Sequence, residues 1–149
     1  MRLELPDLAA MESLGRRIAD ALLIGDVVAL SGGLGAGKTT LARAIIAALG
    51  HESEVPSPSF AIIETYDPPA LRLPLVHADF YRLKHPEEVH ELGLDDYRQG
   101  AALIAEWPES AGGFSHEPGC LSLHLETWGE GRIAAVVAGK DWLERGLWT

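Results

Sequence analysis

The sequence predicts an α/β fold, a mainly parallel β-sheet flanked by helices and extended by a C-terminal antiparallel β-hairpin. Three observations lead to this prediction. Short apolar runs alternate with amphipathic segments, which is typical of alternating strands and helices. A glycine-rich loop joins one such strand to a helix. Two segments of alternating pattern flank a Gly-Glu-Gly turn near the C-terminus. The chain has 149 residues, the size of one domain, so we expect residues 1–149 to form a single domain.

The first part of the chain is predicted to contain two helices with a strand between them. Apolar residues at helical spacing, followed by Gly25 as a stop, predict a helix over Leu8–Leu23. The apolar run over Asp26–Ser31 predicts a strand. Lys38–Leu49 has apolar residues on one helical face and predicts the second helix. The glycine loop therefore lies between a strand and a helix.

The second part is predicted to supply the rest of the sheet. We expect strands over Ser59–Tyr66, Leu73–Phe80 and Gly100–Trp107, and a helix starting within His85–Leu92. The hairpin has two sets of alternating positions, which are Leu121, Leu123 and Leu125, then Ile133, Ala135 and Val137. The segment with Trp142 and Trp148 gives no clear pattern.

Composition excludes several classes of protein. The net charge is −10 and only three lysines are present, which disfavours strong direct binding to nucleic acid. The single cysteine, Cys120, excludes a disulfide within the chain and argues against a cysteine zinc site. No hydrophobic signal region or run of about 20 apolar residues is found, so we expect a cytoplasmic protein without a membrane span.

The loop Gly32–Thr39, GGLGAGKT, fits the P-loop pattern G-x-x-x-x-G-K-[ST]. Glycines let successive backbone N–H groups point at one phosphate, and the following helix adds its free amides and positive dipole end. Lys38 supplies charge to the β- and γ-phosphates, and the Thr39 hydroxyl is a ligand for Mg²⁺. The alternative is a glycine-rich turn without a ligand, but the strand and helix around it favour a nucleotide site. The candidate phosphate-binding residues are Gly33, Leu34, Gly35, Ala36, Gly37, Lys38, Thr39 and Thr40.

Two acidic residues stand at the ends of predicted strands, Asp79 and Glu106. Ligands of open parallel sheets gather at the carboxyl ends of strands. One carboxylate could therefore hold Mg²⁺ while the other orients an attacking water. Solvated boundary residues would show the same pattern. His77 precedes Asp79 by two positions on the same strand face, and a hydrogen-bonded structural histidine is the favoured interpretation.

Other residues leave alternatives open. Ser57-Pro58-Ser59-Phe60 occupies the region that senses the γ-phosphate in many P-loop proteins, although a plain turn explains it as well. The sequence has no asparagine, so the guanine-reading Asn-Lys-x-Asp motif is absent, which favours ATP over GTP. A small-metabolite kinase remains an alternative, with Arg82, Arg98 and Arg132 as candidate phosphoryl clamps. So does a nucleotide-binding switch with negligible hydrolysis.

Five motifs in this order and spacing, GGLGAGKTT, SPSF, HADFYRL, LGLDDY and AEWPE, resemble the TsaE (YjeE) family. The resemblance runs from about Leu5 to Gly139. It implies an ATPase that serves threonylcarbamoyladenosine synthesis on tRNA, working with the TsaB and TsaD proteins and hydrolysing ATP to reset them between turnovers. Low intrinsic activity, raised by the partners, is expected.

The resemblance also implies roles for matching residues. Lys38 and Thr39 match the phosphate lysine and the Mg²⁺ hydroxyl, and Glu106 matches a Mg²⁺ ligand. Asp79 matches an acid needed for hydrolysis. Further matching positions, some with roles less defined, are Met11 beside the adenine, Ser59, Tyr81, Arg82, Trp107 and Arg132. The chain departs from the family at Gly33, where an acidic or amide residue is usual, and at Ser59, where threonine is usual.

Overall fold

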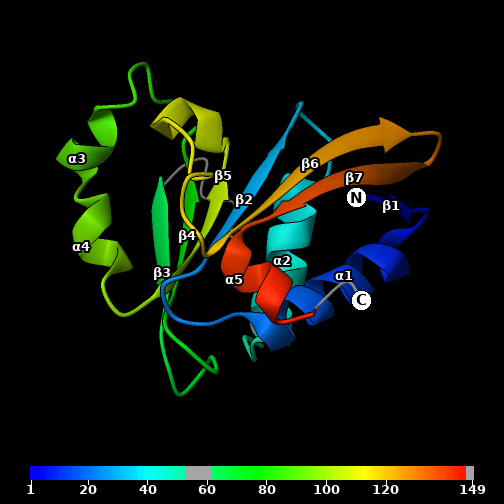
Figure 1. Cartoon of the computed structure of the whole chain (residues 1–149), viewed down its shortest axis with the longest axis horizontal. Coiled ribbons are helices and arrows are strands. Elements are labelled where there is room, and N and C mark those ends of the chain that lie inside the picture. Colours follow the sequence, from blue (N-terminus) through cyan, green and yellow to red (C-terminus); the bar gives the residue numbers. More distant parts are fainter. Residues whose placement is uncertain (53–61, 147–149) are drawn as a thin grey trace.

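The computed structural model describes residues 1–52 and 62–146, which contain a seven-stranded sheet (Figure 1). The strand order is β1-β7-β6-β2-β5-β4-β3. The strands are β1 (Arg2–Leu5), β2 (Val27–Gly32), β3 (Ile63–Tyr66), β4 (Leu75–Asp79), β5 (Ala102–Glu106), β6 (Cys120–Trp128) and β7 (Gly131–Ala138).

The four central strands, β6, β2, β5 and β4, run parallel. Antiparallel strands extend the sheet at both edges, with β7 and β1 beyond β6, and β3 beyond β4. Every residue of β4 and β5 is buried. This explains their continuous apolar runs, because parallel strands are covered on both faces. The α/β fold with a parallel sheet and a C-terminal hairpin is confirmed.

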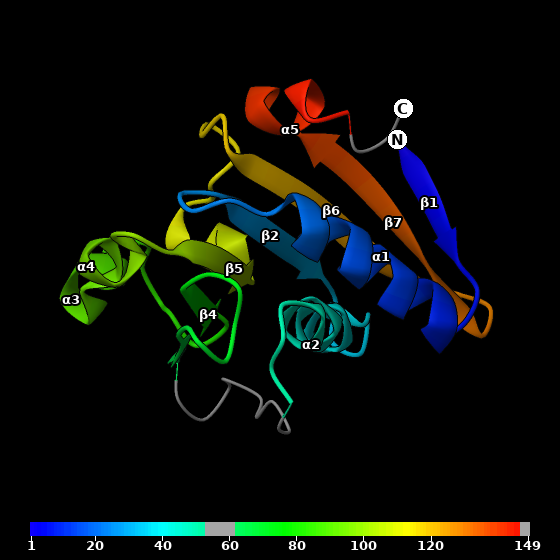
Figure 2. The same ribbon diagram turned by 90° about the horizontal axis from the view of Figure 1, so that it is seen from below.

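Helices cover both faces of this sheet. They are α1 (Leu8–Ala21), α2 (Lys38–Ala48), α3 (Glu88–Leu92), α4 (Leu94–Arg98) and α5 (Lys140–Glu144), with a 3₁₀ turn, η1, over Pro108–Ala111. Figure 2 shows α1 and α2 side by side on one face, while α3 and α4 lie at the β3–β4–β5 end of the sheet. Buried Ile18, Leu41 and Ile45 fill the larger core, and Phe80 and Phe114 belong to the second core on the other face.

Three features differ from the sequence-based expectations. β1 is not among the predicted strands, because four residues are too few to show a period. In the predicted alternating part of β7 the buried residues are Ala134 and Val136, whereas Val137 of the predicted set is exposed. The segment without a clear pattern contains α5, whose Trp142 is fully buried. The candidate residue Ser59, with its neighbours 57–60, lies outside the described residues.

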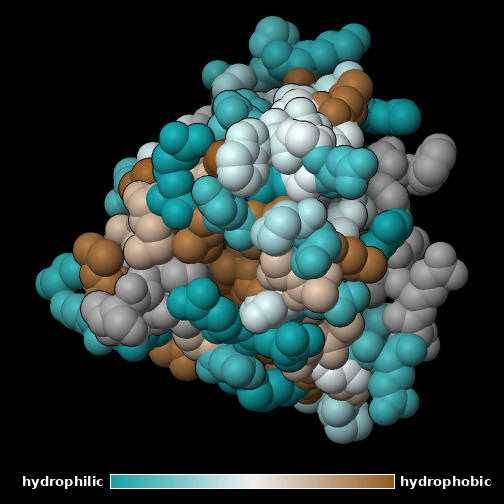
Figure 3. Space-filling model, turned by 90° about the vertical axis from the view of Figure 1, so that its right-hand side faces the viewer, coloured by the Kyte–Doolittle hydropathy of each residue, from teal (hydrophilic) through white to brown (hydrophobic). Residues whose placement is uncertain are grey.

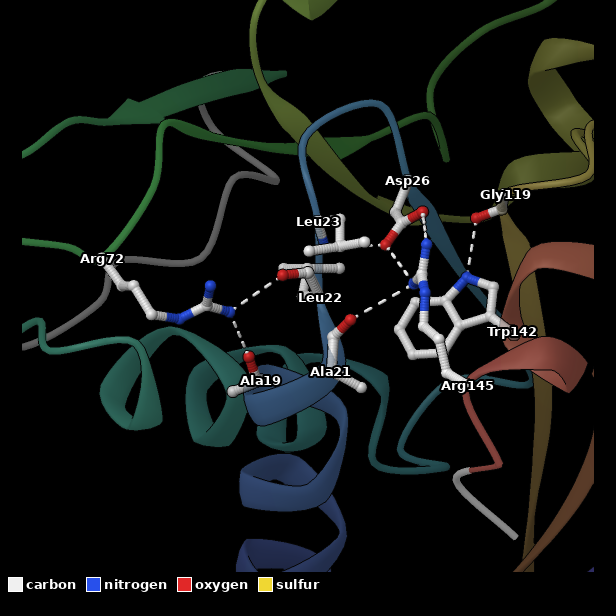
Figure 4. Close-up of polar contacts among 9 residues, drawn as sticks. All are labelled: Ala19, Ala21, Leu22, Leu23, Asp26, Arg72, Gly119, Trp142 and Arg145. Carbon is white, nitrogen blue, oxygen red and sulfur yellow. Dashed lines mark hydrogen bonds and ion pairs between the residues drawn. The ribbon is translucent and has the colours of Figure 1, made fainter.

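A polar cluster fastens α5 to the end of the sheet where β2 begins (Figure 4). Nη1 and Nη2 of Arg145 donate to the two oxygens of the buried Asp26 carboxylate, at 2.6 and 2.9 Å. The backbone N–H of Leu23 donates to the same carboxylate at 2.7 Å. The Trp142 indole donates to the Gly119 carbonyl at 2.8 Å. This cluster lies at the opposite end of β2 from the glycine loop, so it supports the sheet without entering the candidate site.

Cys120 is buried at the start of β6. Burial raises the pKa of its thiol, which fits the structural role of a small apolar side chain. Among the residues that the structure describes, no helix has the length and apolarity required to cross a bilayer.

Candidate nucleotide-binding site

The glycine loop joins the end of β2 to α2, as the sequence predicts. Gly32, Gly35 and Gly37 have φ values of 134°, 75° and 103°. Residues with a Cβ rarely adopt this left-handed region, so the glycines permit the tight turn. Gly37 precedes α2 and makes no side-chain cap. The first amides of α2 are therefore available to an anion, which is the arrangement that binds phosphate at helix N-termini.

Lys38 is the first residue of α2, and its ammonium group folds back onto the loop. Nζ donates to the carbonyl oxygens of Gly32 at 2.8 Å and Gly33 at 2.6 Å. It also lies 4.4 Å from the centre of the Trp107 ring. Burial lowers the pKa of Lys38, while the Glu106 and Asp79 carboxylates act in the opposite direction. Among the described residues Lys38 forms no ion pair, and a phosphate arriving at the loop would supply an anionic partner.

Asp79 and Glu106 lie side by side at the ends of adjacent parallel strands. Asp79 is paired in register with Glu106, and Glu106 with Leu30 of β2. Their exposed fractions are 8% and 1%. Burial raises the pKa of Asp79, partly offset by the Tyr81 backbone N–H, which donates to Asp79 Oδ1 at 2.9 Å. The register of two strands thus brings together residues 27 positions apart in the sequence.

The loop and these strand ends carry oxygen atoms of the kind that hold a divalent cation. The Thr39 hydroxyl donates to Glu106 Oε1 at 2.7 Å, so one hydroxyl and one carboxylate already converge. Mg²⁺ prefers oxygen ligands and takes only one or two carboxylates beside substrate phosphates. The described residues contain no cluster of three or more His, Cys, Asp or Glu side chains suited to a metal. A site for an ion held largely by phosphate and water is therefore the arrangement that these residues fit.

His77 contributes to this site more directly than its sequence position indicates. Its Nε2 lies 2.6 Å from Glu106 Oε2, and its side chain is fully buried. The interpretation as a hydrogen-bonded histidine agrees with this contact. The period of two along β4 places His77 on the same face as Asp79, and that was the signal in the sequence. The identity of its partner depends on the pairing of β4 with β5, which the sequence does not give.

A cleft of about 390 Å³ lies over the loop. Its lining includes most of the candidate residues, which are Leu34, Gly35, Gly37, Lys38, Thr39, Thr40, Asp79, Tyr81, Arg82, Glu106, Trp107 and Arg132. The rings of Tyr81 and Trp107 pack against each other, with their centroids 4.8 Å apart. Trp107 has a φ of 57°, an unusual value for a non-glycine residue. The aromatic pair thus forms one wall beside the phosphate-binding loop.

A second cavity, of about 230 Å³, lies on the other side of Gly37. Met11 of α1 and Arg132 of β7 line it. A Cβ built on Gly37 would be 3.1 Å from Met11 Cε and 3.6 Å from Arg132 Nε. Arg132 also donates to the Ala36 and Gly35 carbonyls, each at 3.1 Å. This cavity lies where β1, β7 and the start of α1 meet, at the end of the molecule that faces the viewer in Figure 3. Figure 3 shows hydrophobic residues exposed among hydrophilic ones on this side of the molecule.

Volume alone does not locate the site. A larger hollow, of about 550 Å³, lies between α1 and α2 and is lined by Leu8, Thr40 and Ala44 among others. Of the predicted site residues, only Thr40 borders it. The linings of the two smaller cavities share Gly37, Thr40 and Arg132, and most of the predicted site residues line one or the other, so these two form the candidate site.

Comparisons with known proteins agree with these observations. The model of the family described as "Threonylcarbamoyl adenosine biosynthesis protein TsaE" matches residues 5–133. A protein of Streptomyces coelicolor, named tRNA threonylcarbamoyladenosine biosynthesis protein TsaE, is 44% identical over 100 residues, covering 66% of this chain and 68% of its own. The protein of the same name from Haemophilus influenzae is 32% identical over 140 residues, covering 90% of this chain and 87% of its own.

A solved structure extends the similarity to the fold. The crystal structure of Bacillus subtilus YdiB superposes with a TM-score of 0.73 at 26% identity, covering 99% of this chain and 93% of that chain. The P-loop fold is therefore confirmed. The family match and the curated relatives show that this chain belongs to the TsaE family, whose members act in tRNA threonylcarbamoyladenosine biosynthesis.

Proposed function

We propose that this chain is a Mg²⁺-dependent ATPase, formed by one domain over residues 1–149, that drives the tRNA threonylcarbamoyladenosine pathway. It binds the TsaB–TsaD pair and hydrolyses ATP to reset or activate that pair between turnovers. One observation carries the proposal. The Thr39 hydroxyl and the Glu106 carboxylate meet at 2.7 Å beside the phosphate-binding loop, and Asp79 is paired in register with Glu106 on the neighbouring strand.

The residues of the loop would bind the phosphates. The free amides at the start of α2 face the β-phosphate, and Lys38 exchanges the Gly32 and Gly33 carbonyls for phosphate oxygens. Gly33, Leu34, Gly35, Ala36, Gly37 and Thr40 complete the cradle. Exchanging carbonyl acceptors for phosphate oxygens strengthens each contact, because the ammonium then faces an opposite charge and not a neutral dipole.

The strand ends would supply the chemistry. Thr39 and Glu106 hold Mg²⁺, which neutralises charge on the β- and γ-phosphates when bound. Asp79 orients the attacking water and accepts its hydrogen bond, since burial raises its pKa toward that of a general base. Ser59 remains a candidate γ-phosphate contact outside the described residues.

The base of the nucleotide would occupy the cavity beside Gly37. Met11 and Arg132 line this cavity, so a flexible apolar side chain and a planar cation can contact an aromatic ring. The absent guanine-reading motif favours adenine. We therefore assign ATP as the nucleotide and Met11 and Arg132 as its contacts outside the phosphate loop.

The acidic charge of the chain fits a division of labour with its partners. TsaB and TsaD would hold the tRNA while this chain supplies ATP turnover in the cytoplasm. Because strong tRNA binding requires many Lys and Arg contacts, a net charge of −10 argues that the isolated chain makes no strong direct contact with tRNA.

The test is ATP turnover by the purified chain, alone and with TsaB and TsaD. We expect slow turnover alone and faster turnover with the partners. Lys38→Ala and Glu106→Ala should each reduce turnover by about 10²-fold or more. Lys140→Ala and Glu144→Ala are matched controls, because both side chains are exposed in a surface ion pair. They should leave turnover unchanged.

A metabolite kinase is the competing function. Arg98, one candidate phosphoryl clamp, makes two contacts with Glu117 at 3.0 and 2.6 Å, and it does not line the cleft over the loop. Because Arg98 is paired with Glu117 away from the cleft, it cannot clamp a phosphoryl group there, which weakens the kinase alternative. Arg82, however, does line the cleft. Turnover that ignores the partners but requires an added metabolite would support the kinase and contradict the proposal.

A further inference from the structure

Glu106 receives a hydrogen bond at each of its two carboxylate oxygens. Thr39 Oγ1 donates to Oε1 at 2.7 Å, and His77 Nε2 lies 2.6 Å from Oε2. A carboxylate has no proton to give, so the imidazole is the donor and carries its proton on Nε2. The two oxygens therefore face different partners. Oε1 faces the phosphate-binding loop, and Oε2 faces the buried imidazole.

The burial of His77 indicates that its contact with Glu106 has a specific role. The imidazole is fully buried, and Glu106 has an exposed fraction of 1%. Within residues 1–52 and 62–146, the other ring nitrogen, Nδ1, has no hydrogen-bond partner. An unpaired buried acceptor costs about 1–3 kcal/mol. A buried apolar side chain at this position would avoid that cost, so the histidine is not explained by packing alone.

We propose that His77 is a positioning residue, which holds Glu106 so that Oε1 is presented to the divalent cation beside Thr39. This inference rests on the proposed function. With the hydrogen bond to His77, the carboxylate is fixed about its last torsion, which is otherwise broad. Partners of this kind behind a metal ligand typically change metal affinity by about 10–100-fold when removed. His77 does not line the cleft over the loop, so it would act on the cation only through Glu106.

The first test measures the cation requirement of nucleotide binding. A fluorescent ADP analogue is titrated into the purified chain in EDTA and across a series of Mg²⁺ concentrations. We expect His77→Leu to raise the half-maximal Mg²⁺ concentration by about 10–100-fold and to leave the EDTA affinity unchanged. His77→Gln should stay within about 3-fold of the parent, because its side-chain amide can donate to Oε2 as the imidazole does.

Other results would overturn the inference. If His77→Leu weakens binding equally in EDTA and in Mg²⁺, His77 only supports the fold. If His77→Leu and the parent require the same Mg²⁺ concentration for half-maximal binding, His77 does not position Glu106 for the cation. His124→Leu is the control for the chemical change, because His124 is exposed and contacts Ser31 instead. Should the parent itself bind no nucleotide, the proposed function fails, and the second test below still decides the position of the proton.

The second test needs no ligand. In ¹H–¹⁵N spectra tuned to imidazole nitrogens, one histidine of the ligand-free chain should show a slowly exchanging proton on Nε2. Its signal is assigned by its loss in His77→Gln. A proton found only on Nδ1, or one that exchanges as fast as those of exposed histidines, would contradict the contact with Glu106 and overturn the inference.

Discussion

Gly32 and Gly33 are neighbours in the loop with opposite surroundings. A Cβ on Gly32 would lie 2.3 Å from the Leu125 carbonyl oxygen, and its φ is 134°. A Cβ on Gly33 would meet nothing within 4 Å. We expect Gly32→Ala to lower the free energy of unfolding by about 2 kcal/mol or more, and Gly33→Ala to change it by no more than about 0.5 kcal/mol. Urea denaturation of the two variants gives the comparison.

The same geometry bears on the departure from the family at position 33. Because the space around Gly33 is open, restoring an acidic residue there should fold normally. Gly33→Asp should therefore show a denaturation midpoint like that of Gly33→Ala. A loss as large as that of Gly32→Ala would mean that the loop is held more tightly at position 33 than the structure shows.

Asp79 should destabilise the ligand-free protein. Burial raises its pKa, so the charged form disfavours the folded state, and this cost disappears as the pH falls through the raised pKa. We expect Asp79→Asn to raise the unfolding temperature of the ligand-free chain at pH 7, while it lowers turnover by about 10²-fold or more. The amide oxygen can still accept from the Tyr81 N–H.

Thermal unfolding at several pH values tests the origin of this effect. The difference between Asp79→Asn and the parent should shrink as the pH falls, since the parent carboxyl is then neutral as well. A difference that stays constant with pH would mean that packing, and not charge, separates the two proteins.

At the scale of elements, the sequence predicts most of the sheet because buried parallel strands are continuous apolar runs bounded by polar residues. The strand-to-helix placement of the loop follows from the same pattern. In β7, however, every residue over 133–138 is apolar, so the pattern does not say which face is buried. The structure buries Ala134 and Val136, because Leu125 and Leu123 of β6 pair with them and face the larger core.

The candidate site is predictable only in part for a related reason. The phosphate loop is contiguous, and its motif identifies Lys38 and Thr39 directly. The positions of Asp79 and Glu106 at strand ends predict them as site residues. That His77 contacts Glu106 requires the order and register of β4 and β5, which are properties of the sheet and not of either segment.

The attachment of α5 leads to a prediction about stability. Arg145 pairs with buried Asp26 and also donates to the Ala21 carbonyl at 3.2 Å. Removing one partner of a buried pair leaves a charge without compensation. Because Arg145 is partly exposed, with 19% of its side chain accessible, we expect Arg145→Met to cost roughly 2 kcal/mol.

Lys140→Met is the matched control in the same helix. Lys140 and Glu144 are 3.9 Å apart, and 78% and 64% of their side chains are exposed, so losing this pair should cost no more than about 0.5 kcal/mol. Chemical denaturation measures both variants. Equal losses would show that α5 is held by its apolar contacts, such as those of Trp142, and not by the ion pair.

At the scale of the whole molecule, the charge leads to a prediction about tRNA. The isolated chain should bind tRNA with a dissociation constant no tighter than about 10⁻⁴ M at physiological salt. Fluorescence anisotropy with labelled tRNA measures this value, alone and in the presence of TsaB and TsaD. Tight binding by the chain alone that weakens steeply with salt would contradict the proposed division of labour.

The pairing of β1 with β7 has a consequence for the newly made chain. Arg2 pairs with Ala135 and Leu5 with Arg132. During synthesis β1 therefore cannot pair until β7, about 130 residues later in the chain, has been made. Met11 and Arg132, which line the cavity beside Gly37, come together only when this pairing closes. Since synthesis proceeds from the N-terminus, a growing chain on the ribosome carries the glycine motif long before it has the pocket. Incomplete chains on the ribosome should therefore not bind the nucleotides of the cell.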